Sequence, residues 1–503
     1  MAVKVPSAQQ PPRQGSAEHE AHGQFEVMLP PRTYSHRRKA SLVTAEDPKH
    51  VARSDEETAC FVHSLIAGEG LTPARVANIH VSQDRTKLEA DLVKDSAITD
   101  TAIEEEDEDE NKEPARRSRS PQVVESRHLT KKQLSDMAWN VRNLSKKLDN
   151  IKLKLNVKTL FLVTKAGDES VIGSTREVTR WLLSKDRKTQ YVVYIESRLQ
   201  VDSQFDYEGL LKEDPSVKDR VKFWDTKLAS EQAHLFDLVV TLGGDGTVLY
   251  TSWLFQHVVP PVLSFSLGSL GFLTKFDFNN YPKILESAIN DGVLVSLRLR
   301  FECTIMRSNP HEQETPASKK QRDLVEELIG DESDGTLSHR PDGVVHILND
   351  IVVDRGPNPT MSSIELFGGD EHFTTLQADG VCIATPTGST AYNMAAGGSL
   401  SHPDNPVILI TAICAHTLSF RPIILPDTVV LRVGVPYDAR TSSWASFDGR
   451  QRVELLPGDY VTVSASRYPF ANVLPSDGRG DDWMRSLSKT LNWNTRQRQK
   501  AMQ

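Results

Sequence analysis

A glycine-rich turn with one ionisable side chain is the clearest candidate for chemistry in the sequence. Residues 243–247 read Gly-Gly-Asp-Gly-Thr and directly follow the apolar run 238–242, and a helical pattern begins after them. Glycines let a phosphate or ribose approach the main chain, and a helix N-terminus adds partial positive charge. The carboxylate of Asp245 could accept the proton of an attacking hydroxyl or orient that hydroxyl toward a γ-phosphate. The alternative is an aspartate that satisfies its own turn.

A second polar turn, residues 385–390, reads Thr-Pro-Thr-Gly-Ser-Thr. Its hydroxyl and N–H groups suit the oxygens of phosphate and ribose, or they cap a helix that begins near Ala391. The sequence contains neither GxxxxGK[ST] nor a complete GxGxxG followed by a ribose-binding acid, and it lacks the protein-kinase set with its HRD loop. A phosphotransferase would therefore be of another type.

Five stretches resemble the NAD kinase family in sequence, order and spacing. They are LGGDGT at 242–247, LGSLGFLT at 267–274, LNDIVVDRG at 348–356, ADGVCIATPTGSTAY at 378–392 and HTLSFRPI at 416–423. GGDG also occurs in diacylglycerol, sphingosine and phosphofructo-kinases, whereas the stretch GSTAY together with Asn349 and Asp350 is specific to NAD kinases. The resemblance covers residues 157–493. It implies ATP-dependent phosphorylation of the adenosine-ribose 2′-hydroxyl of NAD to give NADP, with Mg²⁺ on the ATP.

The resemblance also implies a role for each matching residue. Asp245 would be the base or the orienter at the NAD ribose, and Gly244 and Gly246 would shape the loop around it. The other residues expected to bind NAD are Phe272, Asn349, Asp350, Asp379, Thr390, Ala391 and Tyr392. The residues expected near the ATP phosphates are Gly243, Thr247 and Arg421, of which Arg421 could instead brace the β-rich domain. The family often has glutamate where this chain has Asp350.

Other functions remain open at this stage. A lipid or sugar kinase that shares GGDG would need an apolar pocket or a sugar-phosphate site, and a dinucleotide sensor could keep the fold without turnover. No motif decides between NAD and NADH as the acceptor. Family members form homo-oligomers through the β-rich part, so the resemblance implies a homo-oligomer here, with residues 390–392 placed near a subunit boundary.

The elements needed to position these residues follow from hydrophobic patterning. Apolar runs at 159–163, 191–195 and 236–242 alternate with helical segments, which predicts an α/β unit with a mainly parallel sheet, and alternating or β-branched runs after residue 292 predict a mostly β half. The resemblance implies that these are a Rossmann-like α/β domain over residues 157–291 and a β-rich, sandwich-like domain over 292–475. Within it, the polar segment 309–342 is expected to be a mobile surface insertion.

The two ends of the chain have different patterns. Residues 1–125 are rich in charge, Pro and Ser and are expected to be a disordered tail, with Ser41 and Ser120 as candidate phosphorylation sites. Residues 126–156 carry one apolar stripe, which predicts a helix packed on its own domain or a short oligomer-forming coil. Residues 476–503 are expected to form a helix docked by one apolar face, and the resemblance implies that it packs back on the α/β domain.

The composition and charge of the chain limit the kinds of partner that it is expected to bind. The formal net charge is -9, so the chain has no general attraction to nucleic acid or anionic membrane. No apolar stretch is long enough to span a bilayer, and the first residues do not suit a signal peptide. The four cysteines lie far apart and predict reduced thiols, and the expected location is cytoplasmic.

Overall fold

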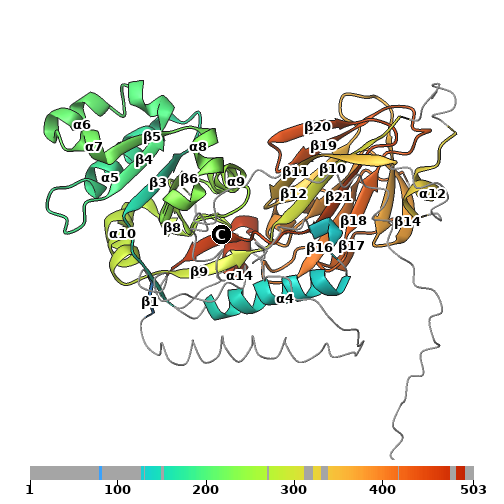
Figure 1. The fold of residues 1–503 in the computed structure, drawn as a ribbon, viewed down its shortest axis with the longest axis horizontal. Helices are drawn as coiled ribbons and strands as arrows, with labels where there is room; N and C mark the ends of the chain where they lie inside the picture. The colour runs from blue at the N-terminus through green and yellow to red at the C-terminus, as the bar shows by residue number, and fades with distance from the viewer. Residues whose placement is uncertain are drawn as a thin grey trace, which may run out of the picture. The chain divides into compact units, whose positions relative to one another are not determined.

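The structure is a computed structural model (Figure 1). It describes residues 79–81, 126–129, 131–148, 152–268, 271–310, 321–329, 338–416, 419–475 and 483–492. Ser41, Ser120 and most of the predicted tail lie outside the described residues. One short piece of that tail is described: β1 (Ile79–Val81) pairs antiparallel with β2 (Leu153–Leu155).

A mainly parallel sheet forms the first half of the fold (Figure 1). Its strand order is β5 (Val221–Trp224), β4 (Val192–Glu196), β3 (Thr159–Thr164), β6 (Leu238–Gly243), β7 (Val262–Ser266), β22 (Phe470–Leu474) and β9 (Leu294–Arg298), and β8 (Phe276–Asp277) pairs beside β7. Strands β3 to β7 are parallel, as the alternation of apolar runs and helices predicts. The predicted α/β fold is confirmed.

The order of these strands creates a switch point. From β3 the chain continues to β4 and β5 on one side, and then crosses to β6 and β7 on the other side of β3. Ligands of open parallel sheets bind outside the carboxyl ends of the strands at such a point. The turn at residues 243–247 leaves the carboxyl end of β6, so the fold places it at this crevice.

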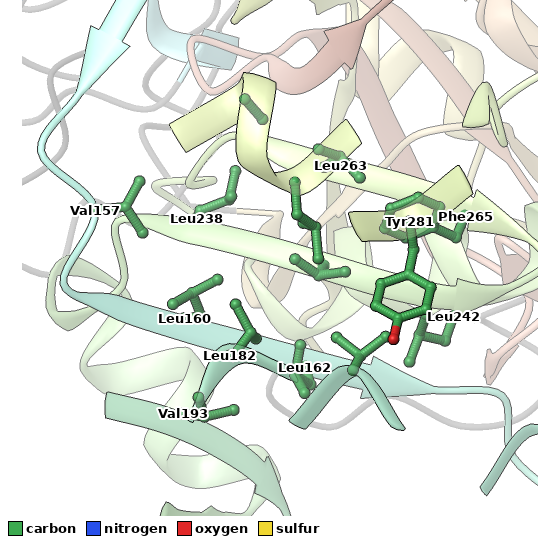
Figure 2. Close-up of a cluster of buried hydrophobic side chains, with 14 of the residues drawn as sticks. Val157, Leu160, Leu162, Leu182, Val193, Leu238, Leu242, Leu263, Phe265 and Tyr281 are labelled. Carbon is green, nitrogen blue, oxygen red and sulfur yellow. The ribbon is translucent and has the colours of Figure 1, made fainter. Parts of the chain in front are cut away.

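Both faces of this sheet are buried, because successive side chains of a strand point to opposite faces. Even-numbered residues of β3 and β6, such as Leu160 and Leu238, share one core with α5 (Glu169–Leu182) and α10 (Tyr281–Asn290) (Figure 2). Odd-numbered residues such as Phe161 share a second core with α8 (Thr226–Glu231) and α9 (Asp245–Leu254). Helices α6 (Tyr207–Glu213) and α7 (Val217–Arg220) complete the first layer.

The predicted boundary at residue 291 needs a correction. Strands β9 and β22 lie within the predicted β-rich domain in sequence, yet both belong to the first sheet. They pair antiparallel with each other, and β22 also pairs with β7. The chain therefore leaves the first sheet after β9 and returns to it through β22, a long-range pairing that local patterning does not reveal.

The second half consists of two antiparallel sheets. One has the order β11 (His339–Ile347), β10 (Phe301–Ser308), β21 (Tyr460–Ala465), β18 (Leu431–Gly434), β13 (Ser362–Gly368) and β14 (Glu371–Ala378). The other has the order β17 (Ile423–Pro426), β16 (Val407–Ile413), β15 (Gly380–Ala384), β12 (Asp350–Asp354), β19 (Ser443–Phe447) and β20 (Gln451–Leu455). Buried residues of both sheets share one core, which confirms the sandwich-like architecture.

The predicted N-terminal helix is shorter than its apolar stripe. Helix α4 spans Lys131–Leu148, and Leu155, the last residue of the stripe, lies on strand β2. Leu134 is buried against Val430 and Ala465 of the β-rich half, and Leu148 joins the core of the first sheet. The helix thus packs on its own chain, as one of the two predicted alternatives requires.

The polar insertion is anchored in its described part, contrary to the prediction of a mobile segment. Helix α12 (Leu324–Ile329) buries Leu324 and Leu328 against a small cluster that contains Phe367 and Tyr437. Arg322 pairs with Glu327 and stacks over the ring of Tyr437 at 4.3 Å. Burial of these two leucines therefore anchors the segment, although the residues around them are polar.

The predicted C-terminal helix is present as α14 (Trp483–Leu491), and it buries Trp483 and Leu487. The rings of Trp483 and of His402, a residue of the β-rich half, pack with their centroids 5.4 Å apart. Packing of this helix on the α/β domain stays a prediction.

Candidate active site

The turn after β6 passes directly into a helix. Asp245 is the first residue of α9, and Gly244 is its N-cap residue. The N–H of Thr247 donates to the carbonyl of Gly244 at 2.9 Å, which leaves those of Asp245 and Gly246 as the candidates for an anion at the start of this helix. Gly243 is required by close packing, because a Cβ atom there would lie 2.2 Å from the hydroxyl oxygen of Thr247. At Gly244 and Gly246 a Cβ atom would meet nothing within 4 Å, so the main chain of the turn is open there.

The carboxylate of Asp245 is held by a second glycine turn. Its Oδ1 accepts hydrogen bonds from the N–H groups of Leu273 and Thr274, both at 3.0 Å, and from the Thr274 hydroxyl at 3.1 Å. Its Oδ2 accepts one bond, from the N–H of Phe272 at 2.8 Å. Gly271 makes this approach possible, since a Cβ atom there would lie 2.2 Å from Oδ1. The aspartate thus accepts hydrogen bonds from a turn that is distant in sequence, and Oδ2, which accepts fewer of them, is the oxygen with room for a further donor.

This geometry brings Phe272 beside Asp245 through its main chain. The ring of Phe272 is half-buried. Its predicted position near a nucleotide ring stays a prediction.

A second group of predicted residues lies at the start of β12. The Asp448 carboxylate accepts the N–H groups of Leu348 at 2.8 Å, Asn349 at 2.8 Å and Asp350 at 3.1 Å. Asp350 is 6% exposed, and its burial, with the nearby Asp448 carboxylate, raises its pKa to about 7. Burial also raises the pKa of Asp448, although the three N–H bonds oppose that effect. Asp448 is a positioning residue that sequence reasoning missed.

The hydroxyl-rich turn packs against this same segment. The N–H of Thr385 donates to the carbonyl of Asn349 at 2.8 Å, and the hydroxyl of Thr385 accepts from the N–H of Gly388 at 3.0 Å. A Cβ atom at Gly388 would lie 2.1 Å from the Asn349 carbonyl oxygen, so only glycine fits. The hydroxyl of Thr385 is used within the fold, which supports the structural interpretation of that hydroxyl.

The three residues after this turn are placed next to it. Thr390 ends the 3-10 helix Thr387–Thr390, Ala391 follows, and α13 (Tyr392–Ala395) begins at Tyr392. The ring of Tyr392 is 46% exposed. Burial of part of that ring, and then the charge of Asp354, raise the pKa of its hydroxyl. Part of the Tyr392 ring is therefore accessible to a ligand.

Two predicted residues have contacts of a different kind. Asp379, between β14 and β15, forms an ion pair with Arg355 at 3.0 Å, and both side chains remain more than one-third exposed. Arg421 is exposed and donates to the carbonyl of Phe420 at 2.8 Å. The roles of Asp379 and Arg421 in binding stay predictions.

One side chain connects the glycine turn with the β-rich half. Arg450 follows Asp448 in the turn between β19 and β20, and its Nη2 donates to the carbonyl of Gly246 at 3.1 Å. Its guanidinium also stacks over the ring of Tyr250 on α9, 4.5 Å from the ring centroid. Sequence reasoning missed Arg450, and the Asp-Gly dipeptide before it was the only available indication of a tight hairpin.

The described part of the chain contains no group of three or more His, Cys, Asp or Glu side chains that could hold a metal ion. Among the described residues, no helix is long and apolar enough to cross a membrane.

Comparisons with known proteins decide the family. The ATP-NAD kinase N-terminal domain matches residues 160–293, and the ATP-NAD kinase C-terminal domain matches residues 348–474. An uncharacterized kinase of Schizosaccharomyces pombe is 44% identical over 368 residues, which are 72% of this chain and 86% of that protein. This chain belongs to the ATP-NAD kinase family.

Named relatives support the same assignment. The NAD(+) kinase of Saccharomyces cerevisiae is 44% identical over 73% of this chain and 66% of that protein. An ATP-NADH kinase of the same yeast is 41% identical over 73% of this chain and 70% of that protein. The crystal structure of a yeast NADH kinase complexed with NADH has a TM-score of 0.56 and 27% identity, over 70% of this chain and 92% of that one. The predicted family and the predicted kinase activity are confirmed.

The burial of Asp350 predicts a pH-dependent stability for this ATP-NAD kinase family member. Its folded pKa of about 7 lies above the ordinary aspartate pKa of 3.8, so between these pH values the native state holds a proton that the unfolded chain has released. The free energy of unfolding should therefore fall as pH rises from 4 to 7, by roughly 4 kcal/mol at most. Urea unfolding at intervals between pH 5 and pH 8 measures this slope.

The variant Asp350→Asn should flatten that slope, because the neutral amide does not titrate. It should also be more stable than the wild type at pH 8. The exposed Asp370→Asn variant is the matched control and should keep the wild-type slope. Parallel profiles for wild type and Asp350→Asn would show that Asp350 is not the titrating group.

Proposed function

We propose that this protein transfers the γ-phosphoryl group of ATP to the adenosine-ribose 2′-hydroxyl of NAD and so produces NADP. The observation that carries this proposal is the Asp245 carboxylate, fixed by four donors at the N-terminus of α9 beside the sheet's switch point. The names of the yeast relatives support NAD and NADH as the acceptor class.

The proposed reaction is an in-line displacement. The ribose 2′-oxygen forms a bond to the γ-phosphorus, and the bond from that phosphorus to the β,γ-bridging oxygen breaks. ADP leaves with the electron pair of the broken bond. The proton of the hydroxyl goes to Oδ2 of Asp245 or, if Asp245 only orients the hydroxyl, to solvent. Main-chain N–H groups of the glycine turn, other than that of Thr247, hold phosphate oxygens.

Mg²⁺ is expected to arrive with ATP. Such sites use one or two carboxylates, phosphate oxygens and water rather than a cage of protein ligands. When bound, the ion would reduce the negative charge on the phosphates.

The acceptor dinucleotide is expected at the start of β12. The side-chain amide of Asn349 is partly exposed, and its main chain is fixed by Asp448 and by the turn at residues 385–390. The amide of Asn349 can bond the hydroxyls of a ribose, and the largely buried carboxyl of Asp350 follows it at the start of β12. Tyr392 follows the turn that packs on Asn349 and offers a half-exposed ring for stacking.

The test is joint detection of ADP and NADP from purified protein given Mg-ATP with NAD, and then with NADH. Stoichiometric ADP and phosphorylated dinucleotide would establish the reaction and rank the two acceptors. Dinucleotide binding without product would instead indicate a sensor. If neither binding nor product is found, diacylglycerol and sugar phosphates are the acceptors to test next.

We further propose a cytoplasmic location and a homo-oligomeric state. The free thiols of Cys303, Cys382 and Cys414 support a reducing compartment. Strand β14 lies at the edge of its sheet and carries Phe373 with 47% of its surface exposed, which supports pairing with a second copy. Analytical ultracentrifugation of the wild type and of Phe373→Lys measures the state, and a monomeric wild type would contradict it.

A further inference from the structure

The Arg450 side chain occupies an unusual place between the two halves of the fold. It belongs to the hairpin turn that joins β19 and β20 in the β-rich half. Its guanidinium nevertheless contacts the carbonyl of Gly246 and the ring of Tyr250, which both belong to α9. The β-rich half thus places a cation directly against the glycine turn.

Among the residues that the structure describes, no carboxylate forms an ion pair with this cation, although Asp448 acts on it from a longer distance. Arg452, two residues further along the hairpin, pairs with Asp354 at 2.9 Å, and Arg355 pairs with Asp379. Within the described part of the chain, Arg450 has no such ion pair, and its contacts are one neutral carbonyl and one aromatic ring. Partial burial lowers the pKa of Arg450, although the charge of Asp448 acts in the opposite direction. Its remaining N–H groups are available to an anion.

The backbone fixes the position of Arg450. Asp448 and Gly449 have φ values of 48° and 65°, as both central residues of a type I′ turn require, and the N–H of Arg450 closes the turn on the carbonyl of Phe447 at 2.9 Å. Asp448 also holds the N–H groups of Asn349 and Asp350. One turn therefore positions the expected acceptor site and carries a cation to the expected donor site.

We propose that Arg450 is a catalytic residue that binds the phosphate oxygens of ATP at residues 243–247 and stabilises the negative charge of the phosphoryl group in transfer. This inference rests on the proposed kinase reaction. Guanidinium groups bind phosphate through paired N–H donors, and such a cation acts most strongly on charge that develops in the transition state. The hydrogen bond to the Gly246 carbonyl is exchanged for bonds to phosphate when ATP binds.

The experiment compares the full-length wild type with Arg450→Ala, Arg450→Lys and the matched control Arg452→Ala. We expect Arg450→Ala to lower kcat about 100-fold and to raise the KM for ATP about tenfold, with the KM for NAD changed less than about threefold. Arg450→Lys should recover part of the loss, because it keeps the charge but not the paired donors. Arg452→Ala should behave as the wild type. A wild-type kcat and KM for ATP in Arg450→Ala would overturn the proposal.

A binding measurement separates this inference from the proposed function. Isothermal titration of inorganic tripolyphosphate, without acceptor, reports the anion site whether or not the protein turns over. Weaker binding to Arg450→Ala than to wild type and Arg452→Ala supports the site, and equal binding overturns it. If the wild type forms no phosphorylated dinucleotide, the kinase proposal fails, while the titration still decides whether Arg450 binds phosphate.

Discussion

Replacement of Asp245 by asparagine is expected to lower kcat by roughly 10²-fold to 10⁴-fold and to leave the fold intact. Asparagine can direct its carbonyl oxygen toward the three donors that now bond Oδ1, so the second glycine turn keeps most of its anchor. The amide nitrogen then occupies the place of Oδ2, where it meets the ribose hydroxyl. An N–H₂ group can neither take the hydroxyl proton nor accept its hydrogen bond.

The rate of NADP formation and the circular dichroism of Asp245→Asn measure the two parts of this expectation. Thr274→Val is the matched control, because it removes one donor to Asp245 and retains the carboxylate. We expect the control to keep more than about one-tenth of wild-type turnover, since one hydrogen bond contributes about 1 kcal/mol. An Asp245→Asn variant that works within threefold of the wild-type rate would exclude both the base and the orienting role.

Local patterning predicted the elements that carry the site. The run Leu238–Gly243 is buried at every position and is apolar apart from Thr241 and its last glycine, and the glycines that follow favour a strand-to-helix turn. The order of alternating elements then implied a parallel sheet. Such inferences succeed because each depends on residues that are close together in the chain.

The features that sequence reasoning missed depend on contacts between distant residues. Arg450 and Gly246 lie 204 positions apart, and nothing near either one indicates that they meet. The return of β22 to the first sheet also depends on a long-range contact, because the sequence pattern of a short apolar strand does not show which of the two halves it joins. Asp448 was in principle detectable, because Asp-Gly between two alternating runs is a hairpin sequence, although its bonds to residues 348–350 are not predictable locally.

Composition misled the analysis where a few residues decide the outcome. The charged surroundings of α12 predicted a surface segment, yet burial of Leu324 and Leu328 anchors it. The stripe that ends at Leu155 continued the helical spacing past Leu148, although strand pairing with β1 takes over there. In both places a tertiary contact outweighed the average character of the segment.

A second large effect is expected at Arg300, in stability rather than in chemistry. Arg300 is fully buried between β9 and β10, and its guanidinium donates to the carbonyls at the end of α9 and just beyond it. The shortest of these bonds are to Phe255 and His257, both at 2.8 Å, and its Nε also donates to Tyr468 at 2.6 Å. One of the carbonyls near α9, that of Ser252, belongs to the last turn of this helix, and the others follow the helix directly.

Replacement of Arg300 by methionine should lower the free energy of unfolding by about 3–5 kcal/mol, because it leaves several buried carbonyls without donors. Urea unfolding of the purified variant measures this loss. The free energy of unfolding of Arg300→Lys should lie between those of the wild type and Arg300→Met, since one ammonium cannot reach the same set of carbonyls. The exposed Arg340→Met is the control and should change stability by less than about 0.5 kcal/mol.

The same substitution tests whether α9 is held at both ends. Asp245 begins this helix and is fixed by the second glycine turn, whereas Arg300 fixes its other end from the β-rich half. A folded Arg300→Met protein should therefore show a lower kcat at temperatures well below its unfolding transition, because the first turn of α9 loses its fixed position. A change of less than about 1 kcal/mol in the free energy of unfolding would mean that water replaces the guanidinium and that the helix end is not held by this residue.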